Sequence, residues 1–138
     1  MTARDYLGQA FRLDQRINSK IEQIGSLNDL AKKCTSTITG MPHNPNKGND
    51  SMATAVVKII DLQEEINKDI DALVDLKKEI YSVIQNIDNV ECQTLLELRY
   101  LSFKTWEEIA VEMDYCIDNV YRLHRKALAL VHIPKTIQ

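Results

Sequence analysis

The stretch TWEEIAVEMDYCIDNVYRLHRKALALV, residues 105 to 131, decides the fold predicted for this chain. Its apolar residues recur at helical spacing in two successive groups, which predicts two short amphipathic helices joined by a tight turn. Ala110 is small enough to let the helices approach closely. Asp114 and Val120 follow it where a helix-turn-helix has a turn residue and a buried aliphatic residue. The expected core of the motif consists of Trp106, Ile109, Ala110, Met113, Ile117, Val120 and Ala127.

The first of these helices has a clear start. Thr105 can cap the free backbone amides while Glu108, three residues later, reaches back, which is the pattern of a capping box. Asp88 and Glu91 repeat this pattern and open a supporting helix that runs to Tyr100. The sequence therefore predicts three helices between residues 88 and 131.

The second helix of the motif carries polar side chains opposite its apolar ones. Asparagine suits adenine edges, arginine suits guanine or phosphate, and tyrosine suits phosphate or thymine methyl groups. We expect base contacts from Asn119 and Arg122, and phosphate contacts from Arg125 and Lys126. Two short helices with a turn also occur in proteins that bind no nucleic acid, where such cations are solvated helix-end charges. The full set expected to contact DNA is Asp118, Asn119, Tyr121, Arg122, Arg125 and Lys126.

The segment LLELRYLSFKTWEEIAVEMDYCIDNVYRLHRKAL, from Leu95 to Leu128, resembles the helix-turn-helix of RNA polymerase sigma factor region 4. There, an arginine-tyrosine helix end precedes an EIA helix and a recognition helix that ends in an alanine-leucine pair. The chain is more similar still to phage-encoded late transcription regulators of the ArpU/RinA-like type, and this resemblance covers most of its length. Asp114 stands where sigma-like sequences usually have glycine, and Cys116 where they usually have a serine or threonine cap.

Two long helices are predicted before this region. The first begins at Thr2, with Asp5 in its first turn, and keeps an apolar stripe as far as Ala31. The second begins at Ser51. An apolar residue recurs in it at every seventh position, the pattern of a coiled-coil seam. This row is Met52, Ile59, Ile66, Leu73, Ile80 and Ile87.

Glycines and prolines break the helical pattern from residue 35 to residue 51, so we predict a flexible loop there. The two long helices then pair as an antiparallel hairpin. Ile60, Val74 and Tyr81 widen the apolar stripe of the second helix beyond what one partner helix covers. A second copy of the chain is the simplest cover for this surface, and we therefore expect a homodimer.

The predicted fold class is all-α, a long antiparallel helical hairpin followed by a C-terminal three-helix unit containing a helix-turn-helix. We assign residues 1–87 to the hairpin and to self-association, and residues 88–138 to a DNA-binding domain.

Composition excludes several classes of protein. The net charge of −3 argues against coating nucleic acid by bulk attraction, and residues 51 to 94 alone carry a net charge of −5. Three widely spaced cysteines fit a reducing cytoplasm. The resemblance to phage regulators implies that this is the cytoplasm of a bacterial host cell. No apolar run is long enough for a bilayer, so no membrane partner is expected. No catalytic, metal-binding or nucleotide-binding motif occurs, so we expect neither an enzyme nor a cofactor.

The resemblance implies a sequence-specific regulator of phage or prophage late genes that binds double-stranded DNA at promoters, with RNA polymerase as a further candidate partner. Two alternatives remain. A small terminase-like DNA-packaging subunit also joins a helix-turn-helix to helical oligomerisation elements. The second alternative is a sigma-like module that binds RNA polymerase rather than DNA. A dimer favours the regulator, whereas a ring of many subunits favours packaging.

Overall fold

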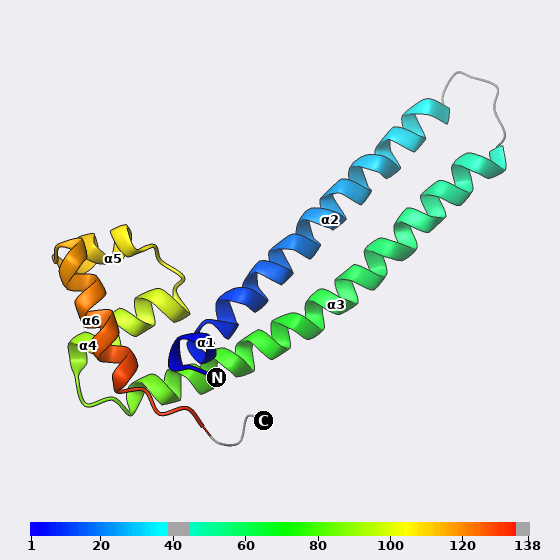
Figure 1. Cartoon of the computed structure of the whole chain (residues 1–138). Coiled ribbons are helices and arrows are strands. Elements are labelled where there is room, and N and C mark those ends of the chain that lie inside the picture. Colours follow the sequence, from blue (N-terminus) through cyan, green and yellow to red (C-terminus); the bar gives the residue numbers. More distant parts are fainter. Residues whose placement is uncertain (39–44, 135–138) are drawn as a thin grey trace. The chain divides into compact units, whose positions relative to one another are not determined.

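The computed structural model of the chain describes residues 1–38 and 45–134, and the side chains of residues 1–33 and 52–134. Every regular element in these ranges is a helix, so the predicted all-α fold is confirmed (Figure 1). The elements are α1 (Ala3–Leu7), α2 (Gln9–Ile38), α3 (Pro45–Gln85), α4 (Val90–Leu96), the π-helical turn η1 (Glu97–Leu101), α5 (Trp106–Met113) and α6 (Ile117–Ala129).

The N-terminal segment forms two helices where the sequence predicts one. Thr2 caps α1 as predicted, because its hydroxyl accepts a hydrogen bond from the Asp5 amide at 3.1 Å. The helical pattern then breaks at Gly8, whose amide donates to the Arg4 carbonyl at 2.9 Å. A Cβ atom at Gly8 would lie only 3.1 Å from the same carbonyl oxygen, so glycine permits this close approach.

The predicted loop from residue 35 to residue 51 is too long. Residues 35–38 continue α2, and residues 45–51 already belong to α3. Pro45 occupies the first position of α3, where its missing N–H costs no hydrogen bond because that amide has no partner inside a helix. Ser51 therefore lies within α3 and does not cap it. The rest of the predicted loop, residues 39–44, lies outside the described residues.

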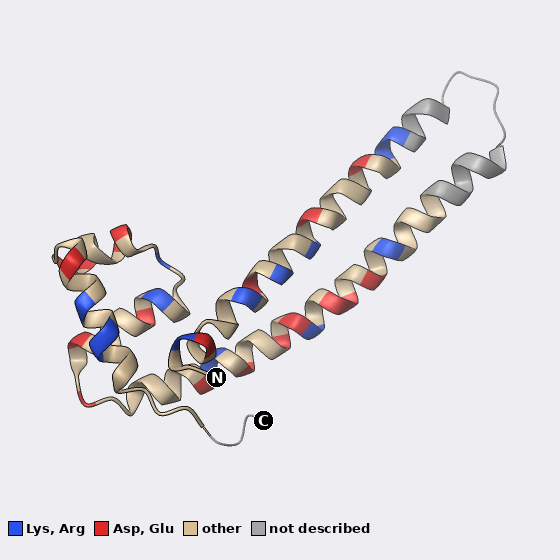
Figure 2. Ribbon diagram, viewed as in Figure 1, with Lys and Arg blue, Asp and Glu red and all other residues tan. Residues whose placement is uncertain are grey.

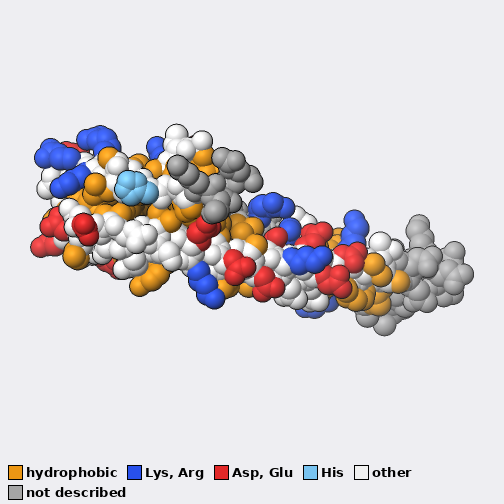
Figure 3. Space-filling model, turned by 90° about the horizontal axis from the view of Figure 1, so that it is seen from below, with side chains coloured by type: hydrophobic (Ala, Val, Ile, Leu, Met, Phe, Trp, Pro, Cys, Tyr) orange, Lys and Arg blue, Asp and Glu red, His pale blue; other side chains and the backbone are white. Residues whose placement is uncertain are grey.

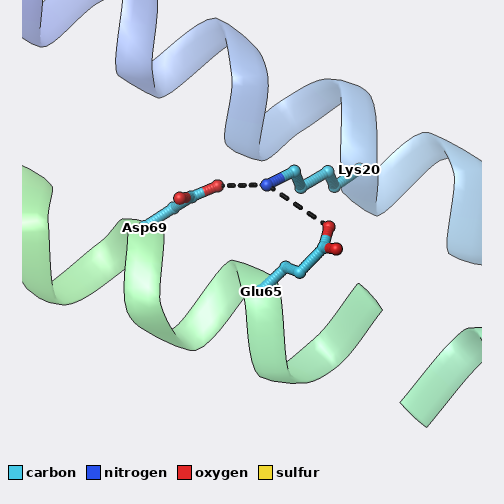
Figure 4. Close-up of polar contacts among 3 residues, drawn as sticks. All are labelled: Lys20, Glu65 and Asp69. Atoms are coloured by element: carbon cyan, nitrogen blue, oxygen red, sulfur yellow. Dashed lines mark hydrogen bonds and ion pairs between the residues drawn. The ribbon is translucent and has the colours of Figure 1, made fainter. Parts of the chain in front are cut away.

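The chain divides into two compact units, residues 15–72 and residues 1–14 with 73–138. The first contains α2 and α3 segments that run antiparallel, as the sequence predicts (Figure 1). Lys20 on α2 joins them, with its Nζ atom 2.6 Å from Asp69 and 3.5 Å from Glu65 on α3 (Figure 4). Lys20 and Asp69 are mostly shielded from solvent, so this pair is less screened than an exposed one.

The second unit, residues 1–14 with 73–138, contains a single buried cluster. The unit combines two stretches of the sequence, and it includes residues on both sides of the predicted boundary between residues 87 and 88. Tyr6 and Leu7 of α1 and Ile80 and Ile84 of α3 are fully buried in the same cluster as α4, α5 and α6. The other members of the cluster are Ala10, Val83, Ile87, Cys92, Leu95, Leu96, Tyr100, Ile109, Val120 and Ala127.

The helix that supports the motif begins one residue later than predicted. Asn89, and not Asp88, is the N-cap of α4, because its side-chain oxygen accepts from the Cys92 amide at 3.1 Å. Asn89 has extended backbone dihedrals, which an N-cap requires, and asparagine is as good a cap as aspartate. Cys92, Leu95 and Leu96 follow on one face and are fully buried, and this fixes α4 under the motif.

Candidate nucleic-acid interface

The turn between α5 and α6 is a Schellman motif. The Asp114 amide donates to the Val111 carbonyl at 3.3 Å, and the Tyr115 amide donates to the Ala110 carbonyl at 3.0 Å. Asp114 has a left-handed backbone, with φ of 59° and ψ of 43°. Aspartate visits this region more readily than most residues, so it replaces the usual glycine without changing the turn.

The two helices of the motif begin differently. Thr105 caps α5 as predicted, because its hydroxyl accepts from the Glu108 amide at 3.2 Å. Cys116 occupies the cap position of α6 with extended backbone dihedrals, but its side chain makes no capping hydrogen bond. The first-turn amides of α6 are therefore left for solvent or for a ligand at this helix end.

Six of the seven predicted core residues belong to the buried cluster or pack against it, and Ile117 does not. Ile109, Val120 and Ala127 are fully buried. The remaining four are partly buried, and these are Trp106, Ala110, Met113 and Ile117.

His124 is a core residue that the predicted core set does not include. Its side chain is only 7% exposed, and its Nε2 atom lies 2.7 Å from the Tyr100 hydroxyl. The Trp106 ring packs edge-on against the imidazole, with 4.6 Å between ring centroids. Burial, and then the charges of Arg4 and Arg99, lower the pKa of His124 from 6.5 to about 4. The signal was present, because position 124 shares a helical face with positions 120, 127 and 131.

All six residues expected to contact DNA are exposed on α6, opposite the buried face. Asn119, Arg122 and Lys126 line one flank of the helix, beside a shallow hollow of about 380 Å³ that also includes Glu91 and Tyr115. A hydrogen bond to Glu91 raises the pKa of Tyr115. Two cationic side chains, Arg122 and Lys126, therefore line the same hollow as the Glu91 carboxylate.

Tyr121 lies on the opposite flank of α6. Its ring packs edge-on against Trp106 at 5.5 Å between centroids, and 39% of the side chain remains exposed. Tyr121 is thus held in place by the first residue of α5, while part of its ring stays available to a ligand. Asp118 and Arg125, which are also exposed, complete the predicted set.

The exposed side chains of α6 favour an anionic partner. Arg122, Arg125 and Lys126 outnumber Asp118, and none of these cations forms an ion pair with any residue that the structure describes. Several Lys and Arg side chains gather at the end of the surface shown in Figure 3 where the motif lies. The acidic side chains are instead concentrated along α3 and α5 (Figure 2).

Arg99 has a local structural role. Its Nη1 atom donates to the Lys104 carbonyl at 3.0 Å, and its guanidinium lies 4.3 Å from the centroid of the Trp106 ring. These contacts connect the end of η1 to the start of α5. Arg99 therefore acts locally as a cation at the end of η1 that holds the start of α5.

Within the described ranges, no three metal-ligating side chains come together, and no helix is long and apolar enough to cross a membrane. Cys92 and Cys116 are both free thiols.

Comparison with protein-family models gives one finding that concerns most of the chain. Residues 44–132 match the family described as protein of unknown function (DUF1492). No curated protein and no solved structure matches the chain significantly. The matched segment includes the whole of α3, α4, α5 and α6. Because this match spans well over half of the sequence, the chain belongs to the DUF1492 family.

Proposed function

We propose that this protein is a sequence-specific regulator of transcription that binds double-stranded DNA with α6 in the major groove. One observation carries the proposal. An amphipathic helix follows a tight turn and exposes Asn119, Arg122, Arg125 and Lys126, while its opposite face is buried against α4 and α5. A major groove about 12 Å wide admits a helix presented in this way.

The order of side chains along α6 assigns their roles. Asn119 lies in the first turn and Arg122 one turn later, where a recognition helix reaches base edges. Arg125 and Lys126 lie further along and are assigned to phosphates. Asp118 fits this surface by accepting from a cytosine amino group or by orienting a neighbouring arginine.

The resemblance to phage late transcription regulators narrows the role. It favours control of phage or prophage late genes in the cytoplasm of a bacterial host. The six exposed residues of α6 occupy the part of the motif that such regulators use for DNA.

A binding experiment tests the DNA contact. Duplexes selected from a random pool by the full-length protein would provide a cognate site, and binding isotherms at several salt concentrations would follow. We expect Arg122→Ala to cost roughly 1 to 3 kcal/mol and to relax preference at one base pair. Lys126→Ala should weaken all sequences alike and lower the salt slope by about one.

Lys78→Ala is the control, because Lys78 is exposed on α3, away from α6. If the pool yields no enriched sequence, or if neither α6 substitution changes affinity or salt slope, α6 is not a recognition helix.

We also propose that the protein acts as a homodimer. Isolated apolar side chains are normal on protein surfaces, but several on one helix are typical of an interface. On α3, Val56, Val57, Ile60 and Ile70 are each between 42% and 56% exposed. A dimer would cover these side chains and would present two copies of α6 to the half-sites of a palindromic site.

Sedimentation of the full-length protein at tens of micromolar tests this part. We expect a dimer, and Ile60→Asp with Ile70→Asp should convert it to a monomer. Ala72→Asp is the control for each added charge, since it introduces one aspartate at an exposed position two residues from Ile70. A monomeric wild type would overturn the dimer, and a ring of many subunits would favour a DNA-packaging role.

Contact with RNA polymerase is a second candidate function, and the exposed face of α5 favours it. Val111 is 81% exposed, and the acids around it include Glu107 and Glu108 on this helix and Asp114 in the turn that follows. An apolar side chain among carboxylates suits a basic protein surface better than DNA. Val111→Lys should therefore weaken binding to purified RNA polymerase without lowering affinity for DNA, whereas Arg122→Ala should have the opposite pattern.

A further inference from the structure

A cavity of about 200 Å³ lies within the unit formed by residues 1–14 and 73–138, apart from the exposed face of α6. Its wall combines segments that are distant in the sequence, the first two helices and the connection between η1 and α5. The side chains that define it are three arginines, Arg4, Arg12 and Arg99, and three aromatic rings, Phe11, Phe103 and Trp106.

The arginines of this cavity lack carboxylate partners. None of them forms an ion pair with any residue in the described part of the chain, and Asp5 is the one acid in the wall. Arg12 donates to the Asp5 backbone carbonyl at 3.0 Å, and Arg99 donates to that of Lys104 at the same distance. Each guanidinium has five N–H donors, so most of them remain available to a ligand.

Like charges gathered around one cavity repel each other unless an anion lies between them. The wall has a net charge of +2, from three arginines and one aspartate. A phosphate monoester carries −1.5 to −2 at neutral pH and offers three strong acceptor oxygens, which arginine pairs with in bidentate geometry. The charge and the donor geometry of the cavity therefore match a phosphate group.

The aromatic rings give this cavity a fixed wall. Phe11 and Phe103 pack edge-to-face at 5.5 Å between centroids, although they are far apart in the sequence. Phe103 has a φ of 58°, a left-handed conformation that is rare for a bulky side chain. Strained residues of this kind cluster at ligand sites, because the surrounding structure must hold them in place. The strain here places an aromatic ring on the cavity wall.

We propose that this cavity binds the phosphate group of a phosphomonoester, with Arg4 and Arg12 supplying the ionic contacts and the rings packing against the adjoining part of the ligand. The cavity is smaller than those that enclose drug-sized ligands, so it accommodates the phosphate and one neighbouring group. This site is separate from the proposed DNA contact on α6 and does not depend on it.

The position of Trp106 couples this cavity to the motif. The Trp106 side chain forms part of the cavity wall, and the Arg99 guanidinium lies over its ring. The same indole packs against Tyr121 and His124 of α6. A ligand that displaces Trp106 or Arg99 would therefore change the support of α6, and phosphate binding would alter the affinity for DNA.

Trp106 also provides the readout, because it is the one tryptophan in the chain. Full-length protein would be titrated with orthophosphate, with adenosine 5′-monophosphate and with adenosine, while tryptophan fluorescence is recorded. Sodium chloride keeps the ionic strength constant. We expect a saturable change with both phosphates and none with adenosine, and tighter binding of the monoester than of orthophosphate.

The variant Arg4→Gln with Arg12→Gln tests the ionic contacts. Both side chains are exposed, so the fold should persist, and circular dichroism would verify this. We expect the dissociation constant for the monophosphate to rise about tenfold or more, since two charge-assisted contacts are lost. Arg16→Gln is the control, because Arg16 lies one turn after Arg12 on α2 and outside the cavity wall. It should change the dissociation constant less than about twofold, in keeping with the small effect of exposed surface charges.

A measurement of DNA binding distinguishes a free phosphomonoester from the phosphate at a DNA end. If free phosphates give no saturable change but the double variant loses affinity for a 5′-phosphorylated duplex relative to the unphosphorylated one, the phosphomonoester belongs to a DNA end. The proposal is overturned if no phosphate gives a saturable change and the two duplexes bind alike. It is also overturned if a folded double variant binds the monophosphate as tightly as the wild type does.

Discussion

The buried histidine of α6 should make the stability of the motif depend on pH. His124 is neutral in the folded protein because its pKa is lowered from 6.5 to about 4. Between these values the unfolded chain binds a proton that the folded chain does not bind. The free energy of unfolding therefore falls as the pH decreases from 6.5 to 4. Above and below this window, His124 does not make the stability depend on pH.

The shift sets the size of the effect. Lowering the pKa of His124 from 6.5 to about 4 corresponds to roughly 3 kcal/mol of unfolding free energy. Residual solvent around the ring should reduce this contribution to about 2 kcal/mol. Urea unfolding followed by circular dichroism between pH 7.5 and 4.5 would measure it. Carboxylates also titrate at the lower end of this range, so the informative quantity is the difference between the wild type and His124→Gln.

The variant His124→Gln should be less stable at neutral pH, because the hydrogen bond to Tyr100 is altered, but it should lose less stability on acidification. His132→Gln should follow the wild type, since His132 is exposed. A His124→Gln curve that runs parallel to that of the wild type from pH 6.5 to 4.5 would contradict a lowered His124 pKa. Parallel curves would mean that the ring is accessible enough to take up its proton in the folded state.

Five further substitutions, at four positions, test the local geometry through the unfolding midpoint. Thr105→Ala should cost about 1 kcal/mol by removing the α5 cap, and an unchanged midpoint would place the helix start elsewhere. Cys116→Ser should add a cap to α6 and stabilise by about 0.5 to 1 kcal/mol, whereas a loss of stability would show that the thiol has another role. Asp114→Gly should stabilise by up to about 1 kcal/mol, since glycine adopts the left-handed turn without steric cost, and Asp114→Ala should destabilise. Tyr6→Phe should be neutral or stabilising by about 1 kcal/mol, because the buried Tyr6 hydroxyl has no hydrogen-bond partner among the described residues.

Local patterns in the sequence predicted the helices well. The spacing of apolar residues located α5 and α6, and residue chemistry located the caps at Thr2 and Thr105. These features depend on interactions within a few residues, so a sequence window contains all the information that they need. The start of α4 was missed by one residue because aspartate and asparagine side by side are equally suitable caps.

The long-range features could not be predicted in the same way. Glycines and prolines indicated a break after residue 35, yet Pro45 is accommodated at a helix start. Likewise, nothing in the local pattern indicated that Tyr6 and Leu7 share a buried cluster with Val120 and Ala127. Such contacts depend on how the helices cross, and many crossings would bury an apolar stripe equally well.

The candidate sites show the same contrast. The exposed set on α6 follows from helical periodicity once the buried face is known. The proposed phosphate cavity does not follow from periodicity, because Arg12 and Arg99 are far apart in the sequence. The residues next to each arginine in the sequence give no sign of a binding site. The sequence did not decide whether His124 is buried, since histidine is intermediate in its preference for interiors and surfaces.

The joining of the two chain ends in one unit has a consequence for synthesis on the ribosome. Residues 1–14 emerge well before most of their buried partners, which lie between residues 80 and 127. The first helix must therefore wait, with Tyr6 and Leu7 uncovered, until α6 has been translated. Residues 15–72 pair locally and are free to fold during this interval. A nascent chain stalled before α6 should thus contain a formed hairpin and an N-terminal segment that remains open to proteases and to chaperones.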